Sequence, residues 1–182
     1  MKFFRSSIAF SLVLALAIGP LSSPLFAELT VPASPVRATP FDGPLARAGF
    51  FNIEAMPVLS KGSVDGLFMR ARSFRYVHEA GSTHWQSPEE TASRGAGDCK
   101  DKSIWLYAAM KKAGYTNVQL VIGRYRDIDR VLHAWITYTD EAGNTILLDP
   151  AKQKRPWNVG EFSPELYKSL YYFDGQNRYR CD

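Results

Sequence analysis

The sequence predicts an α+β domain in which one helix packs on an antiparallel sheet. A helical pattern of apolar residues runs from Cys99 to Lys112. Two runs with a period of two follow at Val118–Ile122 and Val131–Thr139, and this period is typical of strands. A third run, Thr145–Asp149, comes directly after residues 140–144, whose composition is that of a hairpin turn. A helix followed by adjacent antiparallel strands forms an α+β layer.

The first 27 residues have the pattern of a signal peptide. Lys2 and Arg5 form a basic start, the apolar run Ile8–Ile18 is short for a membrane span, and the small residue Ala27 offers a cleavage site. We therefore expect an exported protein that is periplasmic or secreted. A retained membrane anchor is the alternative interpretation of this segment.

Composition and charge narrow the class of partners. Of the 182 residues, 46% are hydrophobic and 13% are aromatic, which is the composition of a globular protein. The formal net charge of +4 includes Lys2 and Arg5 of the expected signal, and the chain contains no dense run of Lys and Arg. We therefore expect no nucleic-acid partner. No later segment is apolar enough to cross a bilayer, so we expect no stable membrane insertion after removal of the signal.

After the signal, the chain divides into two parts. Residues 28–60 have several prolines and little periodicity, which predicts an extended segment over the surface of the domain. Residues 61–182 are expected to form the domain itself. Its first helix is predicted to start after Ser63, a favourable N-cap, and to run to about His78.

The segment before the central helix carries two further helix-start signals. Ser87, Pro88 and Glu90 fit the N-cap, N1 and N3 positions of a short helix. Asp98 is a candidate N-cap for the helix that starts at Cys99. A thiol in the first turn of a helix faces unpaired N–H groups and the positive end of the helix dipole, and both favour the reactive thiolate. The N–H of Cys99 is also a candidate donor to an oxyanion.

His133 is the candidate general base for such a thiolate. It lies mid-strand beside Trp135 in an otherwise apolar run, where an unpaired imidazole would be costly. Asp149 ends the next strand, so its carboxylate can accept from one ring nitrogen while the other nitrogen faces Cys99. A histidine that only satisfies its own hydrogen bonds in the core is the alternative.

Four motifs then occur in the order found in the transglutaminase-like superfamily. They are Trp85–Thr91, Arg94–Lys102, His133–Trp135 and Leu147–Pro150. Over roughly residues 74–150 the chain resembles this superfamily, and it is most similar to the bacterial transglutaminase-like cysteine proteinases. The resemblance implies a papain-like α+β fold, a Cys-His-Asp triad at Cys99, His133 and Asp149, and a protein or peptide substrate.

The leading interpretation is an exported cysteine hydrolase that cleaves amide bonds in proteins or peptides. Transfer of the acyl group to an amine, as in a transglutaminase or an amidase, would use the same residues. A non-catalytic binding module is a further alternative, and a disulfide between Cys99 and Cys181 would be its chemical signature. A redox latch, in which Cys181 caps Cys99 until it is reduced, also stays open.

The resemblance also raises the question of calcium. Family members that process biofilm adhesins depend on calcium held by acidic residues that flank the cysteine, and Asp98 and Asp101 keep carboxylates here. Lys100, however, occupies a position that is commonly acidic, and its ammonium group opposes a divalent cation. We therefore expect no metal and no other cofactor, with Asp98 as an N-cap and Asp101 as a solvated acid of the first turn.

The remaining expectations concern aromatic and histidine residues. Trp85 is expected to be a buried aromatic residue, and His78 and His84 are expected to be surface residues without a role. The aromatic-rich tail predicts a short helix from Ser163 and a last strand.

Overall fold

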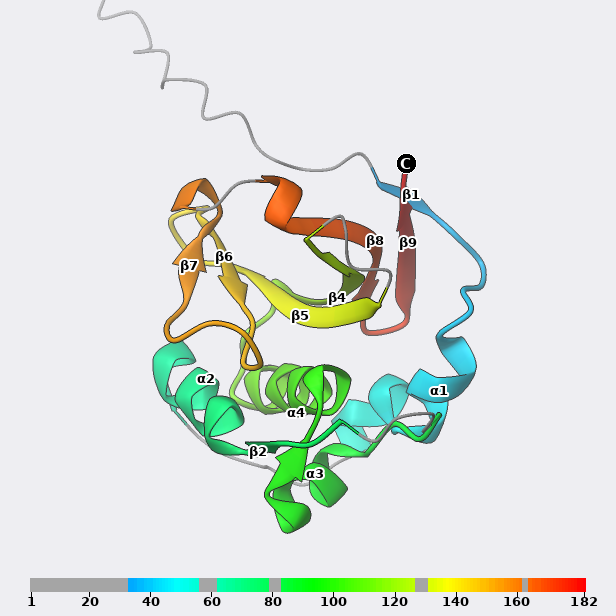
Figure 1. Cartoon of the computed structure of the whole chain (residues 1–182). Helices are drawn as coiled ribbons and strands as arrows, with labels where there is room; N and C mark the ends of the chain where they lie inside the picture. The colour runs from blue at the N-terminus through cyan, green and yellow to red at the C-terminus, as the bar shows by residue number, and fades with distance from the viewer. Residues whose placement is uncertain (1–32, 56–61, 79–82, 127–130, 162–163) are drawn as a thin grey trace, which may run out of the picture.

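One antiparallel sheet forms the framework of the protein, and the α-helices of the protein lie on one side of this sheet (Figure 1). The computed structural model describes residues 33–55, 62–78, 83–126, 131–161 and 164–182. The seven strands have the order β1-β9-β8-β4-β5-β6-β7, and each neighbouring pair is antiparallel. The predicted α+β class is confirmed. The strands of this sheet are β1 (Ala33–Pro35), β4 (Val118–Tyr125), β5 (Leu132–Thr139), β6 (Thr145–Leu148), β7 (Trp157–Asn158), β8 (Tyr167–Asp174) and β9 (Asn177–Cys181).

Helix α4 is the centre of the fold. It packs against β4 and β5 on one side and against α2, α3 and η1 on the other, so it lies between the sheet and the remaining helices (Figure 1). All of its residues from Asp101 to Met110 are buried, and the Ser103 hydroxyl donates to the Ala134 carbonyl of β5 at 3.0 Å. The other elements are α1 (Asp42–Arg47), η1 (Phe50–Ala55), α2 (Val64–Ser73), β2 (Arg75–Tyr76), α3 (Pro88–Arg94), β3 (Ala96–Gly97), α4 (Cys99–Lys112), η2 (Val159–Glu161) and η3 (Pro164–Leu166).

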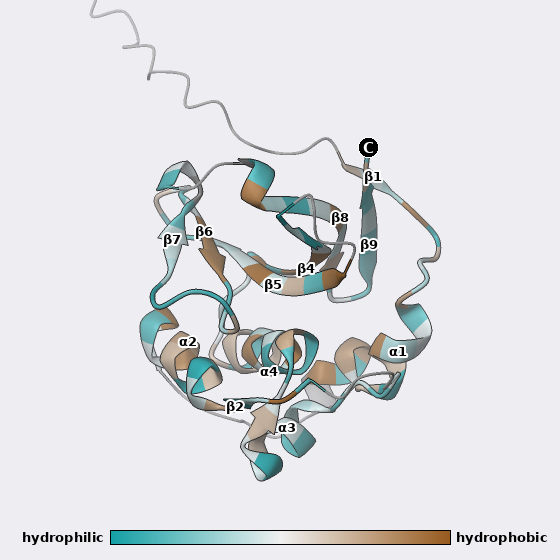
Figure 2. Ribbon diagram, in the orientation of Figure 1, coloured by the Kyte–Doolittle hydropathy of each residue, from teal (hydrophilic) through white to brown (hydrophobic). Residues whose placement is uncertain are grey.

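The sheet buries side chains on both faces. Ala134 and Ile136 of β5 face α4 in the main core, whereas Trp135 points to the other face and packs with Val121 and Tyr167. The predicted alternation along β5 is therefore confirmed. Figure 2 shows that hydrophobic segments gather on β5 and β6, while β9 at the side of the sheet is more hydrophilic.

The predicted helix starts are confirmed by their caps. The Ser63 hydroxyl accepts from the N–H of Gly66 at 3.2 Å, and the Ser87 hydroxyl accepts from the N–H of Glu90 at 3.2 Å. Helix α4 starts at Cys99 with Asp98 as its N-cap. Local capping signals thus define where these helices begin.

The end of α2 differs from the prediction because a tertiary contact stabilises an earlier end of the helix. The helix stops at Ser73 instead of continuing to His78, and residues 75–76 form β2, which pairs in parallel with β3. The buried ammonium of Lys102 on α4 donates to the carbonyls of Phe74 at 3.0 Å and Arg72 at 3.2 Å. These bonds capture carbonyls at the end of α2 and hold the following strand beside α4.

The segment expected to be extended contains two helical stretches, Asp42–Arg47 and Phe50–Ala55, while residues 56–60 lie outside the described part of the chain. Leu45, Ala48 and Phe50 are fully buried in the main core, with Phe50 packed on Tyr107 of α4 at 4.6 Å between ring centroids. Strand β1, earlier in the same segment, pairs with β9. The stretch from Leu45 to Ile53 therefore contributes side chains to the domain core, because burial of its apolar residues compensates for its weak sequence periodicity.

The tail contributes two strands, β8 and β9, where one was expected. A 3-10 turn, η3, precedes β8. Three predictions lie outside the described residues: a helix start at Ser163, the signal peptide 1–27 and a turn at residues 127–130. No helix in the described part of the chain combines the length and the apolar composition needed to span a bilayer.

Candidate active site

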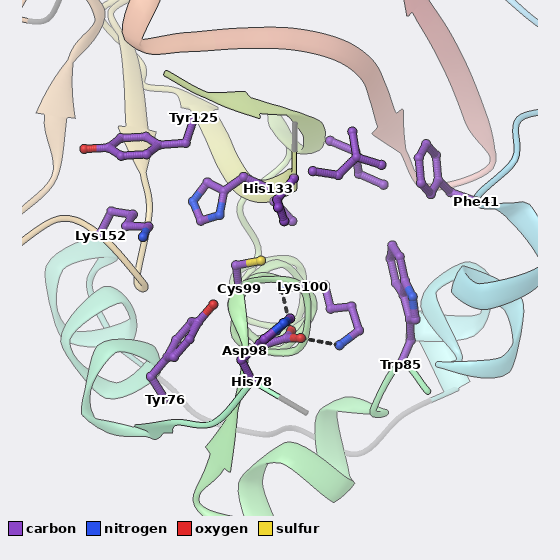
Figure 3. A pocket seen from close by; sticks show the side chains of 14 residues that line it. Phe41, Tyr76, His78, Trp85, Asp98, Cys99, Lys100, Tyr125, His133 and Lys152 are labelled. Atoms are coloured by element: carbon purple, nitrogen blue, oxygen red, sulfur yellow. Dashed lines mark hydrogen bonds and ion pairs between the residues drawn. The ribbon is translucent and has the colours of Figure 1, made fainter. Parts of the chain in front are cut away.

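A cavity of about 540 Å³ opens at the start of α4 and contains both Cys99 and His133 (Figure 3). Tyr76, Tyr125 and Lys152 line one side of this cavity, and Phe41 and Trp85 line the other. Trp85, expected to be buried, is only partly buried and packs on Phe41 at 6.1 Å between centroids. Of the two histidines expected to lack a role, His78 lines this cavity and His84 lies on the surface in a 2.9 Å ion pair with Glu90.

The backbone N–H of Cys99 differs from the neighbouring N–H groups at the start of α4, which have acceptors. The Asp98 carboxylate accepts from the N–H groups of Lys100 and Asp101, at 3.1 and 3.5 Å. Asp101 Oδ2 accepts in return from the N–H of Asp98 at 3.1 Å, which completes a capping box. The N–H of Cys99 is left without an acceptor among the described residues, so it can bind a ligand atom at the cavity floor.

His133 connects Cys99 to Asp149. Its Nε2 lies 2.6 Å from Asp149 Oδ2, and the imidazole and the Cys99 side chain line the same cavity (Figure 3). Burial of the ring opposes protonation, but the hydrogen bonds to Asp149 and Cys99 outweigh it and raise the pKa of His133 to about 9. The imidazolium is thus the favoured form of His133 at neutral pH.

Asp149 is held by donors on both carboxylate oxygens. Its Oδ1 accepts from the N–H groups of Ala151 at 2.9 Å and Lys152 at 3.1 Å. Its Oδ2 accepts from His133 and from the phenol of Tyr167, the latter at 2.9 Å. Because Asp149 is fully buried, these four bonds fix the orientation of the carboxylate that in turn orients the imidazole.

The structure therefore brings the three predicted site residues together and adds two tyrosines that sequence reasoning missed. Tyr167 on β8 supports Asp149 from behind, and Tyr76 on β2 faces Cys99 from the cavity wall (Figure 3). Neither phenol carries a sequence signal, since both lie among many aromatic residues and only the pairing of the strands brings them to the site.

The predicted alternative of a disulfide is not realised. Cys99 and Cys181 are both free thiols. Cys181 pairs with Ala33 near the C-terminus, in a part of the sheet well separated from α4 (Figure 1). In this fold Cys181 neither blocks Cys99 nor caps it.

Comparison with solved structures identifies the fold. EGTA-treated LapG of Legionella pneumophila matches with a TM-score of 0.57 and 16% sequence identity, over 77% of this chain and 77% of that chain. The calcium-bound form of LapG matches with a TM-score of 0.57 and 17% identity, over 76% of this chain and 78% of that chain. This chain has the LapG fold. Since LapG is a transglutaminase-like cysteine protease, the predicted transglutaminase-like fold is confirmed.

No family profile matches the sequence, and no curated protein matches it. The likeness to LapG is therefore a likeness of structure, at a sequence identity that supports the fold alone.

The calcium-bound form of LapG makes the acidic residues beside Cys99 a natural place to test for a cation site. Lys100 Nζ lies 2.5 Å from Asp98 Oδ2 and 3.5 Å from Asp101 Oδ1. The other two carboxylate oxygens accept backbone N–H groups of the capping box. Calcium requires six to eight free oxygen ligands, so these residues do not fit it. In the described part of the chain, no group of three or more His, Cys, Asp or Glu side chains could hold a metal ion.

The prediction that Asp101 is solvated was wrong. Its side chain is buried, with an exposed fraction of 3% for the residue, and Oδ1 accepts from the N–H of Gln86 at 3.1 Å. Burial and the nearby charge of Asp98 raise the pKa of Asp101. Burial opposes the charge on Lys100, but its hydrogen bond to Asp98 and the charges of both carboxylates raise the pKa of Lys100. The lysine thus acts as the counter-ion of this pair.

Proposed function

We propose that the protein is an exported cysteine hydrolase that cleaves amide bonds in proteins or peptides. Cys99 is the nucleophile, His133 is the acid and base, and Asp149 orients His133. The observation that supports this assignment most strongly is the 2.6 Å contact of His133 Nε2 with Asp149 Oδ2, with His133 and Cys99 together lining one open cavity. The LapG fold agrees with a protein or peptide as the substrate.

In the proposed reaction, the Cys99 thiolate attacks the carbonyl carbon of the substrate. A carbon–sulfur bond forms, and the π electron pair of the carbonyl moves to its oxygen, where the free N–H of Cys99 donates to it. When the intermediate collapses, the carbon–nitrogen bond breaks and the His133 imidazolium gives its proton to the leaving amine. Neutral His133 then takes a proton from water, whose oxygen attacks the thioester and releases the acid and the thiolate.

The same acyl-enzyme would serve the acyl-transfer alternative. An amine in place of water would yield a new amide, so adding a dansylated primary amine to the hydrolysis assay separates the two outcomes. Labelled protein product indicates a transglutaminase, and its absence together with new peptide ends indicates a hydrolase.

We further propose that this chemistry proceeds without calcium. The ammonium of Lys100 already forms ion pairs with the carboxylates of Asp98 and Asp101, and all four of their oxygens have donors. For export, the proposal rests on residues 1–27 alone. N-terminal sequencing of the protein from its native host should then start at Glu28, and an intact Met1 would contradict it.

Selective alkylation tests the nucleophile. At pH 7 iodoacetamide should modify Cys99 much faster than Cys181, because Cys181 is 8% exposed and burial, with the charge of Asp182, raises its pKa to about 11. Peptide mapping gives both rates in one sample. Equally slow labelling of the two thiols would overturn the proposal.

Hydrolysis of casein by the protein without residues 1–27 supplies the second readout. Cys99→Ser should lower the rate by roughly a thousandfold or more. The matched control is Cys181→Ser, which removes the thiol distant from the cavity and should retain the rate of the parent.

A further inference from the structure

We infer that Tyr76 is a catalytic residue whose phenol O–H donates the second hydrogen bond to the oxyanion, beside the N–H of Cys99. The inference rests on the proposed function of Cys99 as a nucleophile. It assigns a role to a side chain that neither the sequence motifs nor the contacts of His133 and Asp149 account for.

The backbone of Tyr76 is held directly beside the turn that carries the nucleophile. In the β2–β3 pair Tyr76 lies opposite Gly97, two residues before Cys99. The N–H of Arg75 donates to the Gly95 carbonyl at 2.9 Å, and the N–H of Val77 donates to the Gly97 carbonyl at 3.2 Å. These bonds flank Tyr76 on both sides, so its position relative to the start of α4 is set by backbone pairing.

The same segment is fixed on its other side by α4 itself. Lys102, one turn beyond Cys99, donates its ammonium hydrogens to the carbonyls of Arg72 and Phe74. Tyr76 and the nucleophile are therefore attached to the same helix through short connections. Preorganisation of this kind is what an oxyanion donor requires, since a donor that must move into place loses part of its effect.

The phenol of Tyr76 is directed into the cavity and is available. Figure 3 shows its oxygen pointing toward Cys99 from the side opposite Trp85. No acceptor for this O–H exists among the described residues, although the phenol oxygens of Tyr167 and Tyr172 have partners. Tyr76 thus brings an unused donor to the same end of α4 as the unused N–H of Cys99.

The charges near Tyr76 keep it protonated. Partial burial and the negative charges of Cys99 and Asp98 raise the pKa of its phenol to about 12. The phenol therefore remains a donor throughout the range in which His133, with a pKa of about 9, is an imidazolium. It gives no proton away in the reaction, and the electron pair on the oxyanion returns to the carbonyl when the intermediate collapses.

Two reagents distinguish this role from an effect on the thiolate. Acylation of Cys99 by p-nitrophenyl acetate passes through a tetrahedral oxyanion, whereas alkylation by iodoacetamide displaces iodide without one. Tyr76→Phe should lower the acylation rate by roughly 10- to 100-fold, the lower end of what an oxyanion donor supplies. The alkylation rate should stay within about twofold of the wild type, because the Cys99–His133 pair is unchanged.

Tyr115→Phe is the matched control. The Tyr115 phenol donates to the Gly62 carbonyl at 3.4 Å, and the residue is partly buried and lies outside the cavity, so both rates should equal those of the wild type.

Three results would overturn the inference. Equal acylation rates for the wild type and Tyr76→Phe show that the phenol does not act on the oxyanion, while leaving Cys99 as the nucleophile. A parallel fall of both rates shows that Tyr76 acts on the thiolate instead. If wild-type Cys99 reacts with neither reagent faster than Cys181, the proposed function fails, and the role of Tyr76 fails with it.

Discussion

Replacing Tyr167 by Phe should destabilise the fold through its effect on Asp149. The phenol donates to Asp149 Oδ2 at 2.9 Å, and the exposed fractions of the two residues are 6% and 0%. Water cannot replace the donor at a fully buried oxygen, and a hydrogen bond to a charged group is worth about 1.5–3 kcal/mol. Phe keeps the ring contacts with Tyr125 and Trp135. We therefore expect the free energy of unfolding to fall by about 2 kcal/mol.

Urea unfolding, followed by tryptophan fluorescence, measures this loss. With a slope of about 2 kcal/mol per molar urea, the midpoint should fall by about 1 M. Tyr172→Phe is the control on the same strand, because its phenol donates to the neutral hydroxyl of Ser169 at 3.0 Å. Its midpoint should fall by about 0.5 M at most. Equal shifts in the two variants would refute the reasoning that the charge on Asp149 strengthens the bond from Tyr167.

Three further predictions concern pH, calcium and packing. Because the pKa of His133 is raised to about 9, its imidazolium is present below this pH, and casein hydrolysis should decline as the pH rises through 9; full activity at pH 10.5 would contradict the role of His133. Millimolar calcium or EGTA should change neither the thermal midpoint nor the alkylation rate of Cys99, because the Lys100 ammonium already pairs with both adjacent carboxylates; a calcium-dependent rise of several degrees would show that a site exists. Gly123→Ala should destabilise the protein by roughly 3 kcal/mol in urea unfolding, since the new Cβ would lie 2.1 Å from the Lys168 carbonyl oxygen. Gly160→Ala, with open space around its Cβ, should leave the urea midpoint unchanged.

Gly123 also lies at an irregularity in the pairing of β4. A bulge between Ile122 and Gly123 shifts the register of β4 against β8. The missing side chain lets the Lys168 backbone and the Trp135 ring approach closely. Since Gly123 pairs with His133 on the other side, the irregularity lies next to the histidine proposed as the acid and base.

Lys100 illustrates how one side chain can remove the need of a site for a bound cation. The Lys100 ammonium forms ion pairs with Asp98 and Asp101, at the place where a bound cation would otherwise interact with these two carboxylates. A covalently attached cation is always present, so the proposed enzyme would not respond to the calcium concentration around it.

Local signals in the sequence were sufficient for most of the elements and for the order of the site. The caps at Ser63, Ser87 and Asp98 were predictable because a capping side chain bonds to N–H groups two or three residues away. The strand containing His133 and the strand that ends directly before Asp149 were predictable because alternation is a property of consecutive residues. A hairpin then makes the two strands neighbours, and this suffices to predict the pair of His133 and Asp149.

Contacts between distant segments could not be predicted in the same way. The end of α2 depends on Lys102, the burial of Asp101 depends on Gln86, and the helical state of the segment around Phe50 depends on Tyr107. In each case the free energy comes from burial against a partner that lies well apart in the chain, and no local pattern records such a partner.

The same distinction separates the nucleophile from its supporting groups. Cys99 could be recognised from its neighbours, because a glycine turn, a capping aspartate and a helix start are all adjacent to it in the chain. The two tyrosines could not, because a phenol becomes an oxyanion donor or a carboxylate support only through what it faces. Tyr76 reaches Cys99 through the pairing of β2 with β3, and Tyr167 reaches Asp149 through the return of β8 along β4. Sequence patterns therefore suffice to predict Cys99 as a nucleophile, while its surroundings depend on how the strands pair.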